Sequence, residues 1–168
     1  MTDFALARRN MVDGQIRPSS VTDWRIIDAM RAVPREAFVP SQQREMAYLD
    51  MDIDVFGKGA DRRCLVRPVV SARLLQSANL QLGEHVLVVG CASGYLAALA
   101  AKLAGRVTAT ESVAPLADQA RDILKRLGGF GNVEVKAAAN SEGDPAKLAE
   151  FIRQAPRRPG PTRGPRRS

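Results

Sequence analysis

The sequence has few of the residues that build disulfide scaffolds, metal centres or histidine-dependent active sites. Its two cysteines, Cys64 and Cys91, are too few for a disulfide framework or an all-cysteine zinc site. His85 is the only histidine, which argues against a zinc site and a Ser-His-Asp triad, so we predict no bound metal. No stretch has about 18 uninterrupted apolar residues, and the first residues lack the apolar run of a signal peptide. We therefore expect no membrane partner and a cytoplasmic location.

The positive charge is concentrated at the C-terminal end of the chain. The 168 residues carry a net charge of +7, but residues 151–168 contain six arginines and no acidic residue. The rest of the chain has 19 basic and 18 acidic residues and is nearly neutral. The basic segment has no interleaved aromatic residues and no folded recognition motif, so a nucleic-acid partner is not expected, although weak binding through this segment stays a hypothesis. Residues 146–168 are predicted to form a short helix followed by a disordered tail rich in arginine and proline.

Residues 1–60 are predicted to form a helical lead-in. Thr2 can cap a first helix over residues 3–12, and Ser20 or Thr22 can cap a second one. The apolar face that we predict for the second helix carries Trp24, Ile27, Met30 and Val33. We expect Trp24 to lie in the core or to make a helix-packing contact.

Residues 61–145 alternate between helical and strand patterns and are predicted to form the main domain. The elements expected here are a helix opened by Pro68, a strand at 86–89 buried on both faces, a helix at 95–104, a strand at 107–110, a helix around 116–127 and a strand at 133–137. This order predicts an α/β fold with a Rossmann-like, doubly wound parallel sheet and right-handed crossovers.

The turn after the first strand of this domain is the most informative feature for function. Its sequence is Gly90-Cys91-Ala92-Ser93-Gly94, and Glu111 follows 21 residues after Gly90, at the end of the next strand. A glycine-rich turn allows a nucleotide-like ligand to approach the backbone, and an acid at this distance suits ribose hydroxyls. The spacing fits the Gly-x-Gly-x-Gly turn of S-adenosylmethionine-dependent methyltransferases better than the dinucleotide fingerprint. A purely structural turn stays an alternative.

A series of further motifs follows in the order and at the spacing of one known family. The residues that carry this resemblance are 33–40 (VPREAFVP), 47–50 (AYLD), Pro68, 86–95 (VLVVGCASGY), 105–107 (GRV), Glu111, Leu116, 120–121 (AR) and 132–133 (NV). From about residue 4 to about residue 145, the sequence resembles the protein-L-isoaspartate O-methyltransferase family.

The resemblance implies a repair enzyme that transfers a methyl group from S-adenosylmethionine to the carboxylate of isoaspartyl residues in damaged proteins. The ester then collapses to a succinimide, which can reopen to normal aspartate. The cofactor-binding residues that the turn and the resemblance suggest are Gly90, Cys91, Ala92, Ser93, Gly94, Tyr95 and Glu111. No catalytic residue is assigned, because an ionised carboxylate is already a nucleophile and needs positioning more than a base.

Some positions differ from the family pattern. Ala92 replaces the middle glycine of the turn, Val66 stands at the active-site serine and Val88 at an acidic position, while Ala138-Ala139-Asn140 replace Gly-Asp-Gly. The family's sheet also continues with further strands that this sequence lacks, so we expect a truncated fold and an exposed edge on the strand at 86–89. Such an edge favours self-association. A non-catalytic remnant or interaction protein that retains the half-fold is therefore the alternative to an enzyme.

Overall fold

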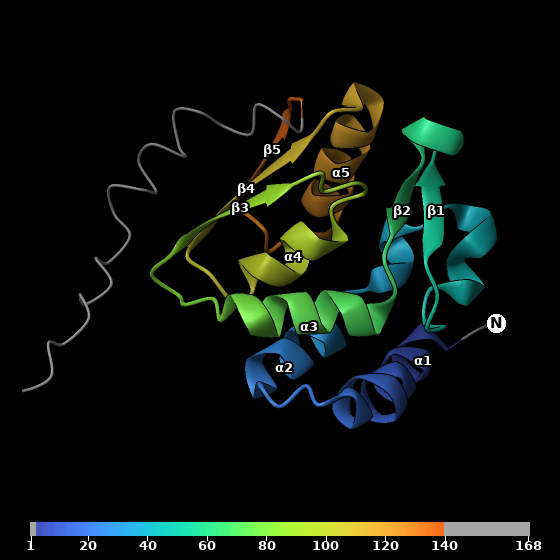
Figure 1. The fold of residues 1–168 in the computed structure, drawn as a ribbon, viewed down its shortest axis with the longest axis vertical. Helices are drawn as coiled ribbons and strands as arrows, with labels where there is room; N and C mark the ends of the chain where they lie inside the picture. The colour runs from blue at the N-terminus through green and yellow to red at the C-terminus, as the bar shows by residue number, and fades with distance from the viewer. Residues whose placement is uncertain (1–2, 140–168) are drawn as a thin grey trace, which may run out of the picture.

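The computed structural model describes residues 3–139, in which N-terminal helices and a hairpin pack beside a three-stranded parallel sheet (Figure 1). The helices are α1 (Phe4–Met11), α2 (Trp24–Ala32), α3 (Pro68–Ala78), α4 (Tyr95–Ala101) and α5 (Ala114–Leu127). The strands are β1 (Ile53–Phe56), β2 (Arg63–Leu65), β3 (His85–Val89), β4 (Arg106–Glu111) and β5 (Val133–Ala137). The short helix and tail predicted for residues 146–168 lie outside the described residues.

The sheet has the strand order β3-β4-β5, and both pairs of neighbouring strands are parallel. Val88 lies opposite Ala109, which in turn lies opposite Val135. These three side chains are buried in one hydrophobic core together with apolar residues of α4 and α5. The helices that connect successive strands therefore cover this side of the sheet, and the predicted α/β fold with a parallel sheet is confirmed.

The prediction that the first strand of this sheet is buried on both faces is wrong. In β3, Val88 is buried, whereas Val89 is 46% exposed. Within residues 3–139, β3 has one neighbouring strand and forms an edge of the sheet. Val88 and Val89 point to opposite faces of the strand, so at this end of β3 one face is covered and the other is not.

The N-terminal capping residues of the two lead-in helices differ from those that the sequence predicted. Asp3 caps α1 by accepting a hydrogen bond from the Leu6 amide at 3.0 Å, while Thr2 lies outside the described residues. Asp23, not Ser20 or Thr22, caps α2. A carboxylate directly before each helix satisfies an amide that the first turn leaves without a helical partner.

Trp24 is 69% exposed, so the predicted core position of this side chain is wrong. The residue is the first of α2, whereas the buried residues Ile27 and Met30 lie further along the helix. A helical side chain leans toward the N-terminus and covers the turn before its own, and at the first position no such turn exists. The sequence pattern identified the correct face but not the beginning of the helix.

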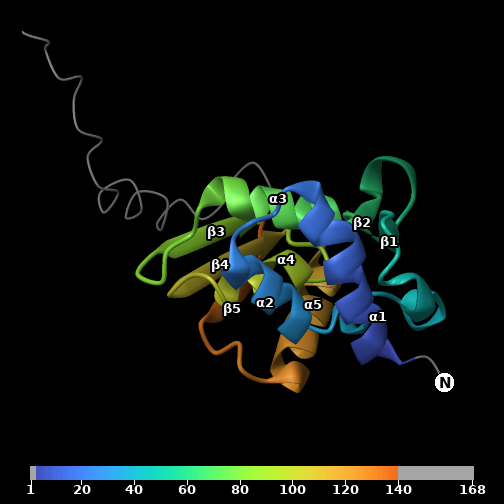
Figure 2. The ribbon, with the colours of Figure 1, turned by 90° about the horizontal axis from the view of Figure 1, so that it is seen from below.

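The lead-in is not entirely helical, because β1 pairs with β2 in an antiparallel hairpin. Gly57, which follows β1, has a φ of +67°, and a Cβ there would lie 2.5 Å from the Asp61 carbonyl oxygen. Only glycine fits this position without a shift of the backbone. In both views the hairpin lies near α1 (Figures 1 and 2).

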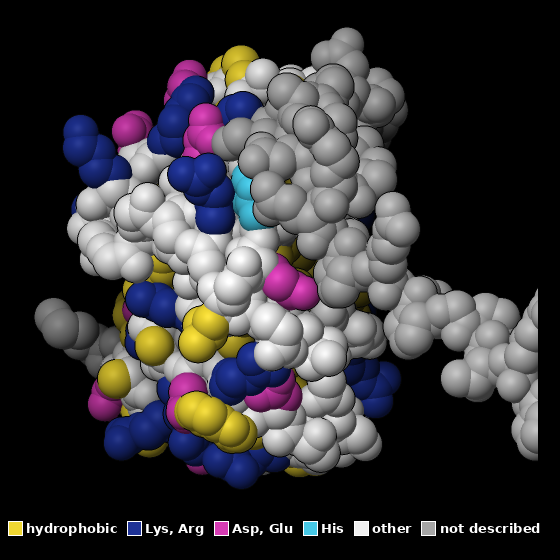
Figure 3. Space-filling view, turned by 90° about the vertical axis from the view of Figure 1, so that its left-hand side faces the viewer, with side chains coloured by type: hydrophobic (Ala, Val, Ile, Leu, Met, Phe, Trp, Pro, Cys, Tyr) yellow, Lys and Arg dark blue, Asp and Glu magenta, His cyan; other side chains and the backbone are white. Residues whose placement is uncertain are grey.

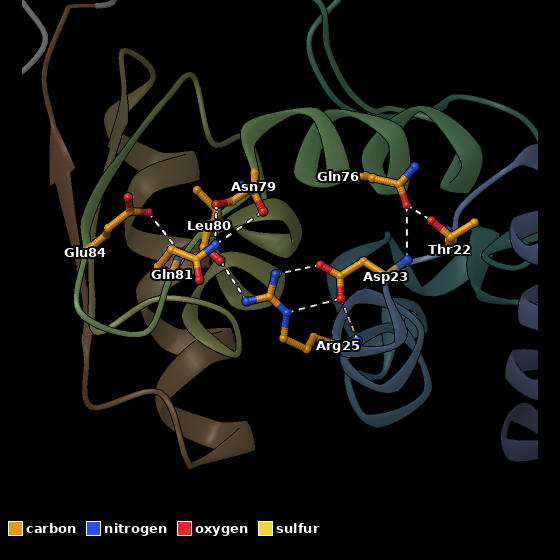
Figure 4. Close-up of polar contacts among 8 residues, drawn as sticks. All are labelled: Thr22, Asp23, Arg25, Gln76, Asn79, Leu80, Gln81 and Glu84. Carbon is orange, nitrogen blue, oxygen red and sulfur yellow. Dashed lines mark hydrogen bonds and ion pairs between the residues drawn. The ribbon is translucent and has the colours of Figure 1, made fainter. Parts of the chain in front are cut away.

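Polar contacts join the lead-in to the main domain at α3 (Figure 4). The Gln76 side-chain oxygen accepts hydrogen bonds from the backbone amides of Thr22 at 2.7 Å and Asp23 at 3.2 Å. The Arg25 guanidinium donates from Nη1 to the Leu80 carbonyl at 2.9 Å. Residues of both segments also belong to the same hydrophobic core. The boundary that we predicted near residue 60 stays a prediction.

Figure 3 shows one face of the molecule, on which basic and acidic side chains are interspersed. The described part of this face has no large area of one charge sign. Among residues 3–139, no helix is both long and apolar enough to cross a membrane. The same residues contain no group of three or more His, Cys, Asp or Glu side chains that could hold a metal ion.

Candidate functional site

The turn between β3 and α4 has the tight geometry that its sequence predicted. Gly90, Ala92 and Gly94 have positive φ angles of +69°, +50° and +95°. The Cys91 amide donates to the Thr110 carbonyl at 2.9 Å, and the Gly94 amide donates to the Cys91 carbonyl at 2.9 Å. Alternating left-handed residues reverse the chain within a few residues and hold it against the end of β4.

Gly94 is also required by the packing of α5. A Cβ at this position would lie 3.2 Å from the Ala120 Cβ, in addition to the strain of its positive φ. The last glycine of the turn therefore serves the fold whether or not a ligand binds.

Glu111 lies at the carboxyl end of β4 and its side chain is fully buried. Its Oε2 accepts a hydrogen bond from the Ala92 amide at 2.9 Å. Its Oε1 accepts from the Val113 amide at 3.1 Å and from the Ser112 hydroxyl at 3.3 Å. The structure thus brings the turn and the predicted ribose-binding carboxylate into direct contact.

Arg63 is a further residue of this site, and the sequence analysis missed it. Its Nε donates to Glu111 Oε1 at 3.3 Å, and its Nη2 donates to the Ser112 hydroxyl at 3.0 Å. The residue belongs to β2 and is 48 positions away from Glu111 in the sequence. No local pattern distinguishes Arg63 from its neighbour Arg62, so only the position of the hairpin identifies it.

Two hydroxyl side chains are buried where the turn leads into α4. Ser93 is fully buried, and its hydroxyl has no partner among the described residues. Tyr95, the first residue of α4, is also fully buried, and the Arg35 guanidinium carbon lies 5.0 Å from the centroid of its ring. Burial raises the pKa of Tyr95 to about 12, and the nearby positive charge of Arg35 opposes the shift. The Tyr95 ring packs against Phe38 with ring centroids 5.5 Å apart, so this side chain is part of the core.

Cys91 is buried in the turn and has the properties of an inert thiol. Burial raises its pKa to about 12, and the negative charge of Glu111 adds to the shift. The thiolate is the nucleophilic form of cysteine and is not populated at neutral pH with such a pKa. Cys91 is therefore a small packing residue and not a nucleophile.

Comparison with known proteins identifies the family of this chain. Residues 7–148 match the family model described as protein-L-isoaspartate(D-aspartate) O-methyltransferase. The chain belongs to this family.

Two curated relatives show the extent of the similarity. The chain is 41% identical over 144 residues to protein-L-isoaspartate O-methyltransferase 1 of Rhodopseudomonas palustris, covering 86% of this chain and 57% of the relative. It is 42% identical over 142 residues to protein-L-isoaspartate O-methyltransferase of Aeropyrum pernix, covering 83% of this chain and 53% of the relative. The chain thus spans little more than half the length of these relatives.

Solved structures support the same fold. A protein-L-isoaspartate O-methyltransferase structure has a TM-score of 0.72 at 24% identity, with coverage of 82% of this chain and 44% of the other. A second structure, from Plasmodium falciparum, is described as a putative protein-L-isoaspartate O-methyltransferase in complex with S-adenosyl-L-homocysteine. It has a TM-score of 0.64 at 18% identity and covers 78% of this chain and 62% of the other.

Val66 is the residue that the resemblance matches to the family's active-site serine. Its carbonyl oxygen accepts a hydrogen bond from Arg35 Nη2 at 2.9 Å, and Arg35 Nε donates to the Ala47 carbonyl at 2.7 Å. Arg35 is fully buried, and desolvation lowers the pKa of its guanidinium. It therefore holds the backbone at position 66 in place, and the Val66 side chain itself carries no hydroxyl.

Val88 is the residue that the resemblance matches to an acidic position of the family. Its side chain is buried in the core and packs as part of the apolar side of β3. Ala138 and Ala139, which replace the Gly-Asp pair of the family, follow β5, and the Ala138 amide donates to the Glu111 carbonyl at 3.0 Å. Asn140 lies outside the described residues.

Proposed function

We propose that this chain binds S-adenosylmethionine at the turn of residues 90–95 and at Glu111, as the cofactor-binding part of a protein-L-isoaspartate O-methyltransferase. The observation that carries the proposal is the buried Glu111 carboxylate, which accepts the Ala92 amide at 2.9 Å in a chain of this family. In α/β sheets, ligands bind beyond the carboxyl ends of the strands, which is where this contact lies.

The residues present fit such a cofactor. The groups that would hold it are the main chain of Gly90, Cys91, Ala92, Ser93, Gly94 and Tyr95, and the side chain of Glu111. The buried Ser93 hydroxyl has no partner among the described residues and can hydrogen-bond a polar group of a ligand. When bound, S-adenosylmethionine supplies an electrophilic methyl group on a positively charged sulfur.

The chain itself has to position the acceptor and exclude water. The proposed acceptor is the carboxylate of an isoaspartyl residue, which is ionised at neutral pH and attacks without a general base. A site that excludes water favours a transfer in which the sulfur loses its positive charge. The resulting ester leads to a succinimide and then to aspartate, so the proposed role is protein repair. The cytoplasmic location stays a prediction from the sequence.

The second candidate is a protein of this family that does not transfer methyl groups. Val66 favours it, because no side-chain hydroxyl is present at the position where the family has its active-site serine.

Titration calorimetry with S-adenosylhomocysteine tests the proposed site. We expect saturable binding to the wild-type chain and at least about tenfold weaker binding to Glu111→Gln, because the amide places an N–H group where ribose hydroxyls need an acceptor. Glu134→Gln is the matched control, since Glu134 is exposed on the neighbouring strand β5, and it should bind like the wild type.

Transfer of a labelled methyl group to an isoaspartyl peptide then separates the two candidates. Transfer supports the enzyme, whereas binding without transfer supports the non-catalytic protein. Absence of binding to a folded wild-type chain contradicts the proposed cofactor site.

A further inference from the structure

We propose that Arg63 competes with the ribose hydroxyls of the cofactor for Glu111, so that hairpin β1–β2 closes the site until Arg63 is displaced. The inference rests on the proposed function, because it concerns the same carboxylate. It assigns a role in ligand access to a residue that lies outside the turn.

The Glu111 carboxylate already accepts hydrogen bonds from several donors of the chain. An ionised carboxylate offers about four acceptor positions. In this structure Oε1 accepts from Arg63, Ser112 and Val113, and Oε2 accepts from Ala92. The carboxylate is also fully buried. Because Oε1 already has three donors and the carboxylate has no exposed surface, a ribose diol that donates to both oxygens of Glu111 must displace a donor from Oε1.

Arg63 is the donor that can leave with least change to the fold. The Ala92 and Val113 amides belong to the backbone of the turn and of the segment that leads into α5, and Ser112 is the direct neighbour of Glu111. Arg63 comes from β2, and its contact is made by the end of a long side chain that is 22% exposed. When displaced from Glu111, the guanidinium can turn toward solvent.

Displacement of Arg63 has an electrostatic cost. Arg63 is the only cation in an ion pair with Glu111 among the described residues, and ribose hydroxyls replace its hydrogen bond but not its charge. A buried carboxylate that loses its cation keeps a negative charge that no nearby positive charge balances, which is unfavourable away from water. The contact therefore opposes ligand binding and makes the closed state of the site more stable.

The hairpin strand β2 leads directly into Val66. Arg63 lies three positions before Val66, whose carbonyl is held by Arg35. Release of Arg63 removes the contact that ties β2 to Glu111. Binding of the cofactor thereby removes one contact that fixes the strand leading to position 66.

The test is titration of S-adenosylhomocysteine into the full-length wild type, Arg63→Ala, Arg63→Met and Arg62→Ala. Arg62 is the matched control, because it is the neighbouring residue and pairs with Asp54 in the hairpin rather than with Glu111. We expect about tenfold tighter binding to both Arg63 variants, since no charge-assisted hydrogen bond has to be broken. Arg63→Met keeps the apolar part of the side chain if Arg63→Ala folds poorly.

Thermal unfolding gives a second readout. Without ligand, the Arg63 variants should unfold at a lower temperature than the wild type, because Glu111 loses its ion pair. With ligand, their unfolding temperature should rise by more than that of the wild type.

The outcomes separate this inference from the proposed function. Tighter binding to the Arg63 variants, or binding to them alone, supports the competition. Equal binding to wild type and variants leaves the cofactor site in place and overturns the competition. Weaker binding to the variants places Arg63 among the ligand contacts and overturns it too. Absence of binding to every folded variant contradicts the proposed cofactor site, and the competition with it.

Discussion

Ala92 has a backbone conformation that L-residues other than glycine rarely adopt. Its φ is +50°, between two glycines with positive φ, and its side chain is buried. The left-handed region brings the Cβ close to the following carbonyl oxygen, which costs roughly 1–2 kcal/mol. The amide of this strained residue is the one that binds Glu111, so the strain lies at the candidate site.

Replacement of Ala92 by glycine should therefore stabilise the protein. We expect Ala92→Gly to raise the free energy of unfolding by roughly 0.5–1 kcal/mol, because the relieved strain exceeds the added entropy of the unfolded chain. Urea unfolding followed by circular dichroism measures this. Ala97→Gly in α4 is the control and should lower the free energy of unfolding by about 1 kcal/mol or more. Destabilisation by both changes would show that the Ala92 methyl group contributes more through packing than it costs.

The first turn of α2 determines how the lead-in is attached to the main domain. Asp23 caps this helix through the Arg25 amide and forms an ion pair with the Arg25 guanidinium at 2.6 Å (Figure 4). The Asp23 amide in turn donates to Gln76 of α3. One short segment thus combines a cap, an ion pair and an interhelical contact, and the attachment depends on charge.

The stabilisation by Asp23 should depend on pH. The hydrogen bond from the Arg25 side chain lowers the pKa of the Asp23 carboxyl below its ordinary value of 3.8. A lowered pKa in the folded state means that the stabilisation is present above the unfolded pKa and is lost as the pH falls through the folded pKa. Asp23→Asn keeps a capping side chain without the charge, and we expect it to cost about 1 kcal/mol at pH 7.

Urea unfolding at a series of pH values tests this dependence. The difference between wild type and Asp23→Asn should shrink as the pH falls below about 4. Asp28→Asn, an exposed position of the same helix, is the control. A difference that is independent of pH would contradict a role for the charge.

The whole molecule presents one edge of its parallel sheet along β3. Val89 is 46% exposed there, and within residues 3–139 the strand pairs only with β4. Unpaired backbone groups on an apolar edge strand can pair with a strand of another chain. We infer that a second copy of this chain is the partner available to this edge in a purified sample.

Self-association should therefore increase with protein concentration and depend on Val89. Size-exclusion chromatography with light scattering should detect dimers or larger species of the wild type, and Val89→Lys should reduce them, because a charged side chain on an edge strand opposes pairing. Leu82→Lys is the control, since Leu82 is 72% exposed but lies outside the strands. A monomer at every concentration, or an equal effect of both changes, would contradict pairing through β3.

The sequence by itself determined the alternation of strands and helices from 86 to 137, the turn at Gly90 and the position of Glu111 after β4. These features depend on local chemistry. Apolar periodicity selects the elements, glycines allow positive φ, and parallel strands bring their carboxyl ends to one edge of the sheet. For the same reason, the motifs of the isoaspartyl methyltransferase family could be recognised without a structure.

Only the tertiary structure decided which distant residues complete the site. Arg63 reaches Glu111 across 48 positions, and Arg35 reaches Val66 across 31. The exposure of Trp24 and of Val89 also depends on which neighbours are present, and not on the residues themselves. Contacts between distant residues leave no periodic signal in a single sequence, because each is set by the packing of whole elements and not by the conformation of one segment.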